Sequence, residues 1–148
     1  MRMRWILVSA AILAGCAYKA ASSSETTREV TSERSHLGCL EVGIDRRGDL
    51  GNAAVVRYAF ENHCAERTSV DLGWATVIGR TAEGSEVALI PTKKESSVTI
   101  EPHATGETTL AYPAPAPIGQ LCVDVASLAQ QTPAQWRCFG DPEAVALR

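Results

Sequence analysis

The feature that most constrains this chain is the alternation of apolar and polar residues from Cys39 onward. Leu40, Val42 and Ile44 alternate with polar or small residues, and further along Val56, Tyr58 and Phe60 do the same. A period of two places every second side chain on one face of a strand, which is typical of half-buried β-strands. The sequence therefore predicts an all-β domain.

Turn-forming residues divide this region into seven or eight short strands. The predicted strands cover residues 40–45, 56–61, 70–78, 87–90, 97–101, 107–112 and 121–125, with an eighth at 136–139. In 70–78 the predicted buried face carries Val70, Leu72, Trp74, Thr76 and Ile78. Residues 127–135 are compatible with one helical turn. Short strands with turn signals about every 8–12 residues are typical of a β-sandwich.

The N-terminus has the pattern of an export signal. Arg2 and Arg4 precede an apolar run over residues 5–13. A membrane-spanning helix needs about 20 apolar residues, so this run predicts a signal peptide over residues 1–15.

The end of this segment, Leu13-Ala14-Gly15-Cys16, resembles the lipobox of bacterial lipoproteins. The resemblance implies cleavage between Gly15 and Cys16 and attachment of a diacylglyceryl group, with fatty acids such as palmitate, to the Cys16 thiol. Because Ala17 replaces the aspartate of an inner-membrane retention signal, the resemblance also implies the outer membrane of a diderm host. The alternative is an ordinary secretory signal in which Cys16 is incidental.

Residues 16–38 are predicted to be the lipidated cysteine and a flexible tether. The segment is rich in Ser, Thr, Glu and Arg, and it contains few apolar side chains to offset the entropy of ordering. The predicted domains are therefore the signal peptide, this tether, a sandwich over 39–140 and a C-terminal tail over 141–148.

Four cysteines lie in the predicted domain: Cys39, Cys64, Cys122 and Cys138. An even number in an exported domain favours two disulfides, and four cysteines allow three pairings. We favour Cys39–Cys64 and Cys122–Cys138, since each pair brackets a predicted hairpin. Against the first pair, Cys39 and Cys64 do not share a face if their strands pair by hydrophobic register.

Further features resemble the immunoglobulin-like domains of small bacterial lipoproteins. They are Asn62 after a strand, a strand with Trp74, a turn with Gly84, and an I-x-P-x-x-x-G turn that begins at Ile100. The resemblance covers about residues 39–140 and implies an immunoglobulin-like β-sandwich, with no implied activity.

No pattern of catalytic residues is recognisable. The histidines are His36, His63 and His103, and no serine stands in a nucleophile elbow. The pairs Asp45/Asp49 and Glu61/Asp71 are the available carboxylates for acid–base chemistry, but exposed carboxylates are common on strands and turns. We expect no enzyme and no cofactor.

A zinc site is the alternative use of the first two cysteines. His36, Cys39, His63 and Cys64 form a Cys₂His₂ donor set if Cys39 and Cys64 are neighbours. Their spacing matches no standard zinc finger, and an oxidising compartment favours the disulfide. We therefore predict no metal ligands.

The aromatic residues are expected to serve the core rather than a carbohydrate-stacking surface. The set is Trp74, Trp136, Tyr58, Tyr112, Phe60 and Phe139. Trp136 is the exception, because it shares a strand face with Cys138 and is positioned to pack on a disulfide.

These observations predict a non-enzymatic, lipid-anchored envelope protein that serves as a structural or protein-interaction module. Its expected partners are the membrane, through the lipid, and an envelope protein that binds an edge such as residues 111–117. The formal net charge of −3 becomes −5 once Arg2 and Arg4 leave with the signal peptide, which disfavours nucleic-acid binding. The alternative function is a periplasmic lipoprotein that binds a small ligand or a metal.

Overall fold

The computed structural model describes residues 34–92 and 96–140. The predicted signal peptide, Cys16, most of the predicted tether and the tail at 141–148 lie outside the described residues. Within them, neither of the two short helical segments is long and apolar enough to cross a bilayer.

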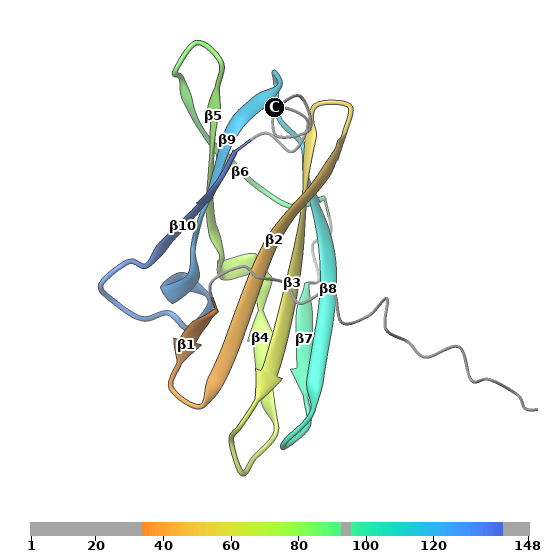
Figure 1. Ribbon diagram of the computed structural model, residues 1–148, viewed down its shortest axis with the longest axis vertical. Coiled ribbons are helices and arrows are strands. Elements are labelled where there is room, and N and C mark those ends of the chain that lie inside the picture. Colours follow the sequence, from red (N-terminus) through yellow and green to blue (C-terminus); the bar gives the residue numbers. More distant parts are fainter. Residues whose placement is uncertain (1–33, 93–95, 141–148) are drawn as a thin grey trace, which may run out of the picture.

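One layer of the molecule is a four-stranded antiparallel sheet. It contains β1 (Ser35–Leu37), β2 (Leu40–Leu50), β3 (Ala53–Asn62) and β8 (Thr105–Tyr112), in the order β1-β2-β3-β8 (Figure 1). The β2–β3 hairpin predicted between Cys39 and Cys64 is confirmed.

The facing layer consists of a second four-stranded sheet and a two-stranded sheet. The larger has the order β10-β9-β5-β6 and is built from β5 (Thr76–Thr81), β6 (Glu86–Leu89), β9 (Ile118–Asp124) and β10 (Trp136–Phe139). The smaller pairs β4 (Thr68–Asp71) with β7 (Ser97–Ile100). Two 3₁₀ turns, η1 (Leu72–Trp74) and η2 (Val125–Ala129), connect these strands. The predicted all-β sandwich is confirmed.

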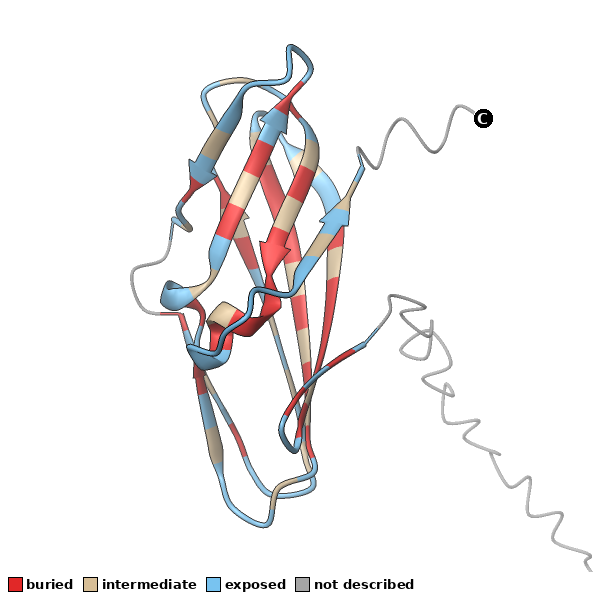
Figure 2. Cartoon of the chain, turned by 90° about the vertical axis from the view of Figure 1, so that its left-hand side faces the viewer, coloured by how far each residue is buried: buried red, intermediate tan, exposed pale blue. Residues whose placement is uncertain are grey.

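The core lies between the two layers, where alternating residues of facing strands meet. Burial alternates along the strands in Figure 2 as the period of two predicts. The predicted buried faces of β2 and β3 are confirmed, with Val42 1% and Tyr58 0% exposed. Opposite them lie Leu121 and Val123 of β9, both fully buried. Burial of each large apolar side chain contributes about 1.5–3 kcal/mol relative to its exposure.

The predicted strand over 70–78 is wrong in its middle. Asp71 ends β4 and caps η1, its carboxylate accepting a hydrogen bond from the Gly73 amide at 2.8 Å. This turn interrupts the alternation, so that in β5 Val77 is buried instead of Ile78. Trp74 consequently lies outside the core and is 60% exposed.

The domain also begins before residue 39. Residues 35–37, predicted as part of the tether, form edge strand β1, and Ser35 and Leu37 are buried. Gly38, at φ +65, makes the tight turn into β2. A three-residue strand is too short for its alternation to be recognised in the sequence. With β1 and the division of 70–78, the described residues contain ten strands instead of seven or eight.

Both preferred disulfides form. Cys39 lies in the β1–β2 turn and Cys64 lies just after β3, so both are beyond the strand ends and the predicted mismatch of faces does not apply. Cys122 and Cys138 are direct cross-strand partners in β9 and β10. In the chain-entropy model each bridge stabilises the fold by about 3 kcal/mol.

Candidate functional site

Within residues 34–92 and 96–140, two surface sites gather side chains with chemical or binding potential. The first, here called the Trp136 groove, lies on the outer face of the β10-β9-β5-β6 sheet and has a volume of about 270 Å³. Its lining residues are Ile78, Arg80, Glu86, Gln120, Cys122, Trp136 and Cys138.

Strand register builds the groove. Cys122 of β9 lies between its cross-strand partners Cys138 and Ile78, which together provide a largely apolar surface. Arg80 and Glu86 form an ion pair with an N–O distance of 2.5 Å among the polar lining residues. Trp136, 42% exposed, lines the same groove as the two cysteines of this disulfide.

Asp124 positions Trp136. The Asp124 carboxylate accepts hydrogen bonds from the amides of Ala126 (3.1 Å) and Gln135 (2.8 Å). It thereby fixes both ends of the connection between β9 and β10, and Trp136 is its direct cross-strand partner. The sequence pattern identified Trp136, but it did not predict that Asp124 is buried and holds the β9–β10 connection by hydrogen bonds.

The second site, here called the His63 cluster, lies on the outer face of β2 and β3 beside the Cys39–Cys64 disulfide. His63 Nε2 is 3.3 Å from a carboxylate oxygen of Glu41 and 3.6 Å from one of Glu61. The Arg34 guanidinium bridges both carboxylates, at 2.7 Å from Glu41 and 3.0 Å from Glu61. The hydrogen bond from Arg34 is the main cause that lowers the pKa of Glu41, and the neighbouring histidines act in the same direction.

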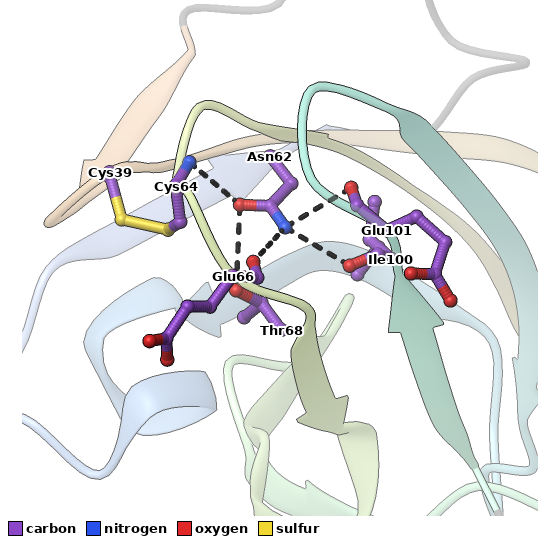
Figure 3. Close-up of a disulfide and its surroundings, with 7 residues drawn as sticks. All are labelled: Cys39, Asn62, Cys64, Glu66, Thr68, Ile100 and Glu101. Carbon is purple, nitrogen blue, oxygen red and sulfur yellow. Dashed lines mark hydrogen bonds between the residues drawn. A yellow bond between two sulfur atoms is a disulfide. The ribbon is translucent and has the colours of Figure 1, made fainter.

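Asn62 holds the backbone next to this cluster (Figure 3). Its side chain is fully buried, and Nδ2 donates to the carbonyl oxygens of Glu66 (2.9 Å), Ile100 (3.0 Å) and Glu101 (3.2 Å). Its Oδ1 accepts a hydrogen bond from the Cys64 amide at 2.9 Å. In the sequence, Asn62 stands out only as part of a pattern, and no local signal indicates this role.

The structure does not bring the considered zinc donors His36, Cys39, His63 and Cys64 together as a metal site. Because the sulfur atoms of Cys39 and Cys64 are bonded to each other, they are not available as thiolate ligands and the Cys₂His₂ site does not form. His63 instead meets Glu41 and Glu61. His36 lies opposite Glu41 in the β1–β2 register, and His103 lies in the turn between β7 and β8.

The carboxylate pairs considered for acid–base chemistry have other partners. Asp45 pairs with Arg47 at 3.2 Å, and Asp49 pairs with Arg46 at 2.8 Å. Asp71 caps η1, whereas Glu61 belongs to the His63 cluster. The two carboxylates of each considered pair therefore interact with different groups in the structure.

The aromatic residues divide between core and surface. Tyr58, Phe60 and Tyr112 are buried as predicted, and Phe139 packs against the core. Trp74 is exposed, which corrects the expectation of a core role for it, and Trp136, which the sequence pattern set apart as the exception, is exposed as well. The buried Tyr112 also means that the 111–117 edge presents its prolines and alanines instead of an aromatic ring.

The fold and the two disulfides define the class: a disulfide-linked, all-β sandwich protein. Comparison with protein-family models gives no match, and comparison with curated proteins gives none either. Among solved structures, the chain is similar to the YjhA protein from Bacillus subtilis, with 12% sequence identity and a TM-score of 0.44. The similarity covers 68% of this chain and 83% of the other.

Proposed function

We propose that this chain is a non-enzymatic, lipid-anchored protein of the bacterial envelope that binds a partner protein through the Trp136 groove. The N-terminal lipobox-like sequence supports the anchor, and the Ser/Thr-rich segment that follows it would give the sandwich reach from the membrane. The absence of an aspartate after Cys16 supports an outer-membrane location.

The observation that carries the binding proposal is the exposed Trp136 beside apolar groove surface. Tryptophan is among the residues most enriched at the energetic centres of protein interfaces. An apolar centre with polar residues around it is also the usual layout of such interfaces. In the groove, Ile78 and the disulfide supply the apolar part, while Arg80, Glu86 and Gln120 supply polar groups.

Site-specific photo-cross-linking in living cells tests this proposal. A photoreactive amino acid at Gln120, inside the groove, should cross-link to a discrete protein species. Trp136→Ala should remove that species, because it removes the proposed anchor residue. The same probe at Glu107, on the outer face of the opposite layer, should not give it.

Trp74→Ala is the matched control, since Trp74 is also an exposed tryptophan but does not line the groove. It should leave the cross-link from Gln120 intact. Cross-links that are equal from Gln120 and Glu107, or that persist in Trp136→Ala, would contradict the proposal.

A further inference from the structure

The His63 cluster combines one imidazole with two carboxylates in an arrangement close to that of metal ligands. One donor atom each from Glu41, Glu61 and His63 lies within 4.8 Å of the others. Ligands of a tetrahedral Zn²⁺ ion at about 2.0–2.1 Å are about 3.3–3.5 Å from one another. The separations of His63 Nε2 from the two carboxylates, 3.3 Å and 3.6 Å, are therefore close to the distances that zinc requires.

The backbone holds these three residues in place before any ion binds. Glu41 and Glu61 are direct cross-strand partners in the β2–β3 ladder. The His63 amide extends that ladder by donating to the Cys39 carbonyl at 3.0 Å. His63 also stands between the buried Asn62 and the disulfide-bonded Cys64, so its position along the chain is fixed from both sides.

The cluster already attracts a cation in the form of Arg34. A single guanidinium nitrogen, Nη1, bridges the two carboxylates through Glu41 Oε1 and Glu61 Oε2, whereas His63 Nε2 faces the other oxygen of each carboxylate. A metal ion bound together with His63 would therefore have to share both carboxylates with this positive charge. The Arg34 side chain is 50% exposed and precedes the first strand, so it can leave at small cost. Exposed ion pairs contribute only about 0.2–1 kcal/mol each.

We propose that Glu41, Glu61 and His63 form a binding site for a divalent transition-metal ion, with Zn²⁺ as the representative, and that Arg34 competes with the metal for the two carboxylates. Imidazole nitrogen with carboxylate oxygen suits zinc and its neighbours better than Ca²⁺ or Mg²⁺, which prefer all-oxygen sites. Three protein ligands leave a fourth position for water, as in open zinc sites. The inference is independent of the Trp136 groove.

Isothermal titration calorimetry with Zn²⁺ tests the site. The whole chain is used with both disulfides formed, without a polyhistidine tag and with the Cys16 thiol blocked, so that no other strong ligand competes. Zinc should bind with one-to-one stoichiometry. Removal of outer partners of metal ligands already costs about 10–100-fold in affinity, so His63→Gln and Glu61→Gln should each weaken binding at least tenfold.

Two further variants separate a metal site from general attraction by surface charge. Glu107→Gln removes a comparable exposed carboxylate from the same sheet face and should leave zinc affinity unchanged. Arg34→Gln removes the competing cation and should tighten binding by about two- to fivefold.

The inference is wrong if zinc does not bind, or if His63→Gln binds it as well as the unaltered chain. It is equally overturned if Glu107→Gln loses as much affinity as Glu61→Gln, or if Arg34→Gln weakens binding. A titration with Ca²⁺ tests selectivity. Equal affinity for Ca²⁺ and Zn²⁺ would contradict the proposal, because it would indicate a carboxylate site in which the imidazole has no role.

Discussion

Asn62 is a buried amide whose hydrogen bonds join three segments at one end of the sandwich. From the end of β3, its side chain bonds to the loop that carries Cys64 and to the end of β7 with the residue that follows it. An alanine at this position would remove one hydrogen bond from the Cys64 amide and one from each of three carbonyl oxygens, of which that of Ile100 is buried. Each such loss costs about 1–3 kcal/mol.

We therefore expect Asn62→Ala to lower the free energy of unfolding by at least about 2 kcal/mol. Chemical denaturation with the disulfides intact measures the effect. Asn52→Ala provides the control: Asn52 is exposed in the β2–β3 turn, and exposed substitutions usually stay within about 0.5 kcal/mol. Equal destabilisation by the two variants would rule out a special role for Asn62.

At the scale of single residues, the sequence predicted which apolar side chains are buried but not which polar ones are. The alternation identified Val42 and Tyr58 as buried because apolar periodicity reports directly on burial. The alternation did not indicate that Asn62 and Asp124 are buried, because these polar side chains are buried only where the folded chain provides their hydrogen-bond partners. The His63 cluster escaped prediction for a related reason: Glu41 and Glu61 become neighbours only through the register of β2 and β3.

At the scale of elements, Arg46 links β2 to the opposite layer. Its side chain is only 2% exposed, and the guanidinium donates to the carbonyl oxygens of Ile118 (2.6 Å) and Gly140 (3.0 Å) and pairs with Asp49. Ile118 begins β9 and Gly140 follows β10, so one side chain connects the two sheets. Hydrogen bonds of charged groups contribute about 1.5–3 kcal/mol.

Arg46→Gln is expected to destabilise the fold by about 1.5–3 kcal/mol, because glutamine cannot serve all of these acceptors. Thermal or chemical unfolding is the measurement. Arg47→Gln is the matched control, since Arg47 is the adjacent residue but its side chain is 49% exposed. A result in which Arg47→Gln costs as much as Arg46→Gln would refute the linking role.

The strand boundaries show where the local sequence pattern no longer predicts which residues form a strand or face the core. Segments with a clean alternation, such as β2 and β3, were predicted with the correct face. The error at 70–78 arose because a single 3₁₀ turn reverses which residues face inward while leaving an apparently continuous pattern. Strand β1 was missed since three residues between polar segments carry too little periodic signal.

At the scale of the whole molecule, the proposed anchor gives a direct expectation. Cells supplied with an alkyne analogue of palmitate should incorporate it into this chain, and intact-mass analysis should find a lipid-bearing chain that starts at Cys16. Cys16→Ser should abolish the label, because serine lacks the thiol that carries the diacylglyceryl group.

A shortened chain without added lipid mass would instead indicate an ordinary secretory signal. Labelling that persists in Cys16→Ser would exclude Cys16 as the modified residue. Either result would refute the anchor while leaving the sandwich and its two surface sites unaffected.

The order of the disulfides along the chain has a consequence for biogenesis. Cys39 pairs with Cys64 and Cys122 pairs with Cys138, so each cysteine of the domain is joined to the next one available. A chain that emerges from a translocation pore N-terminus first would present each pair before the following one appears. Once the proposed lipid occupies the Cys16 thiol, an oxidase that joins thiols in order of arrival would therefore produce the native pattern directly, with no reshuffling by an isomerase.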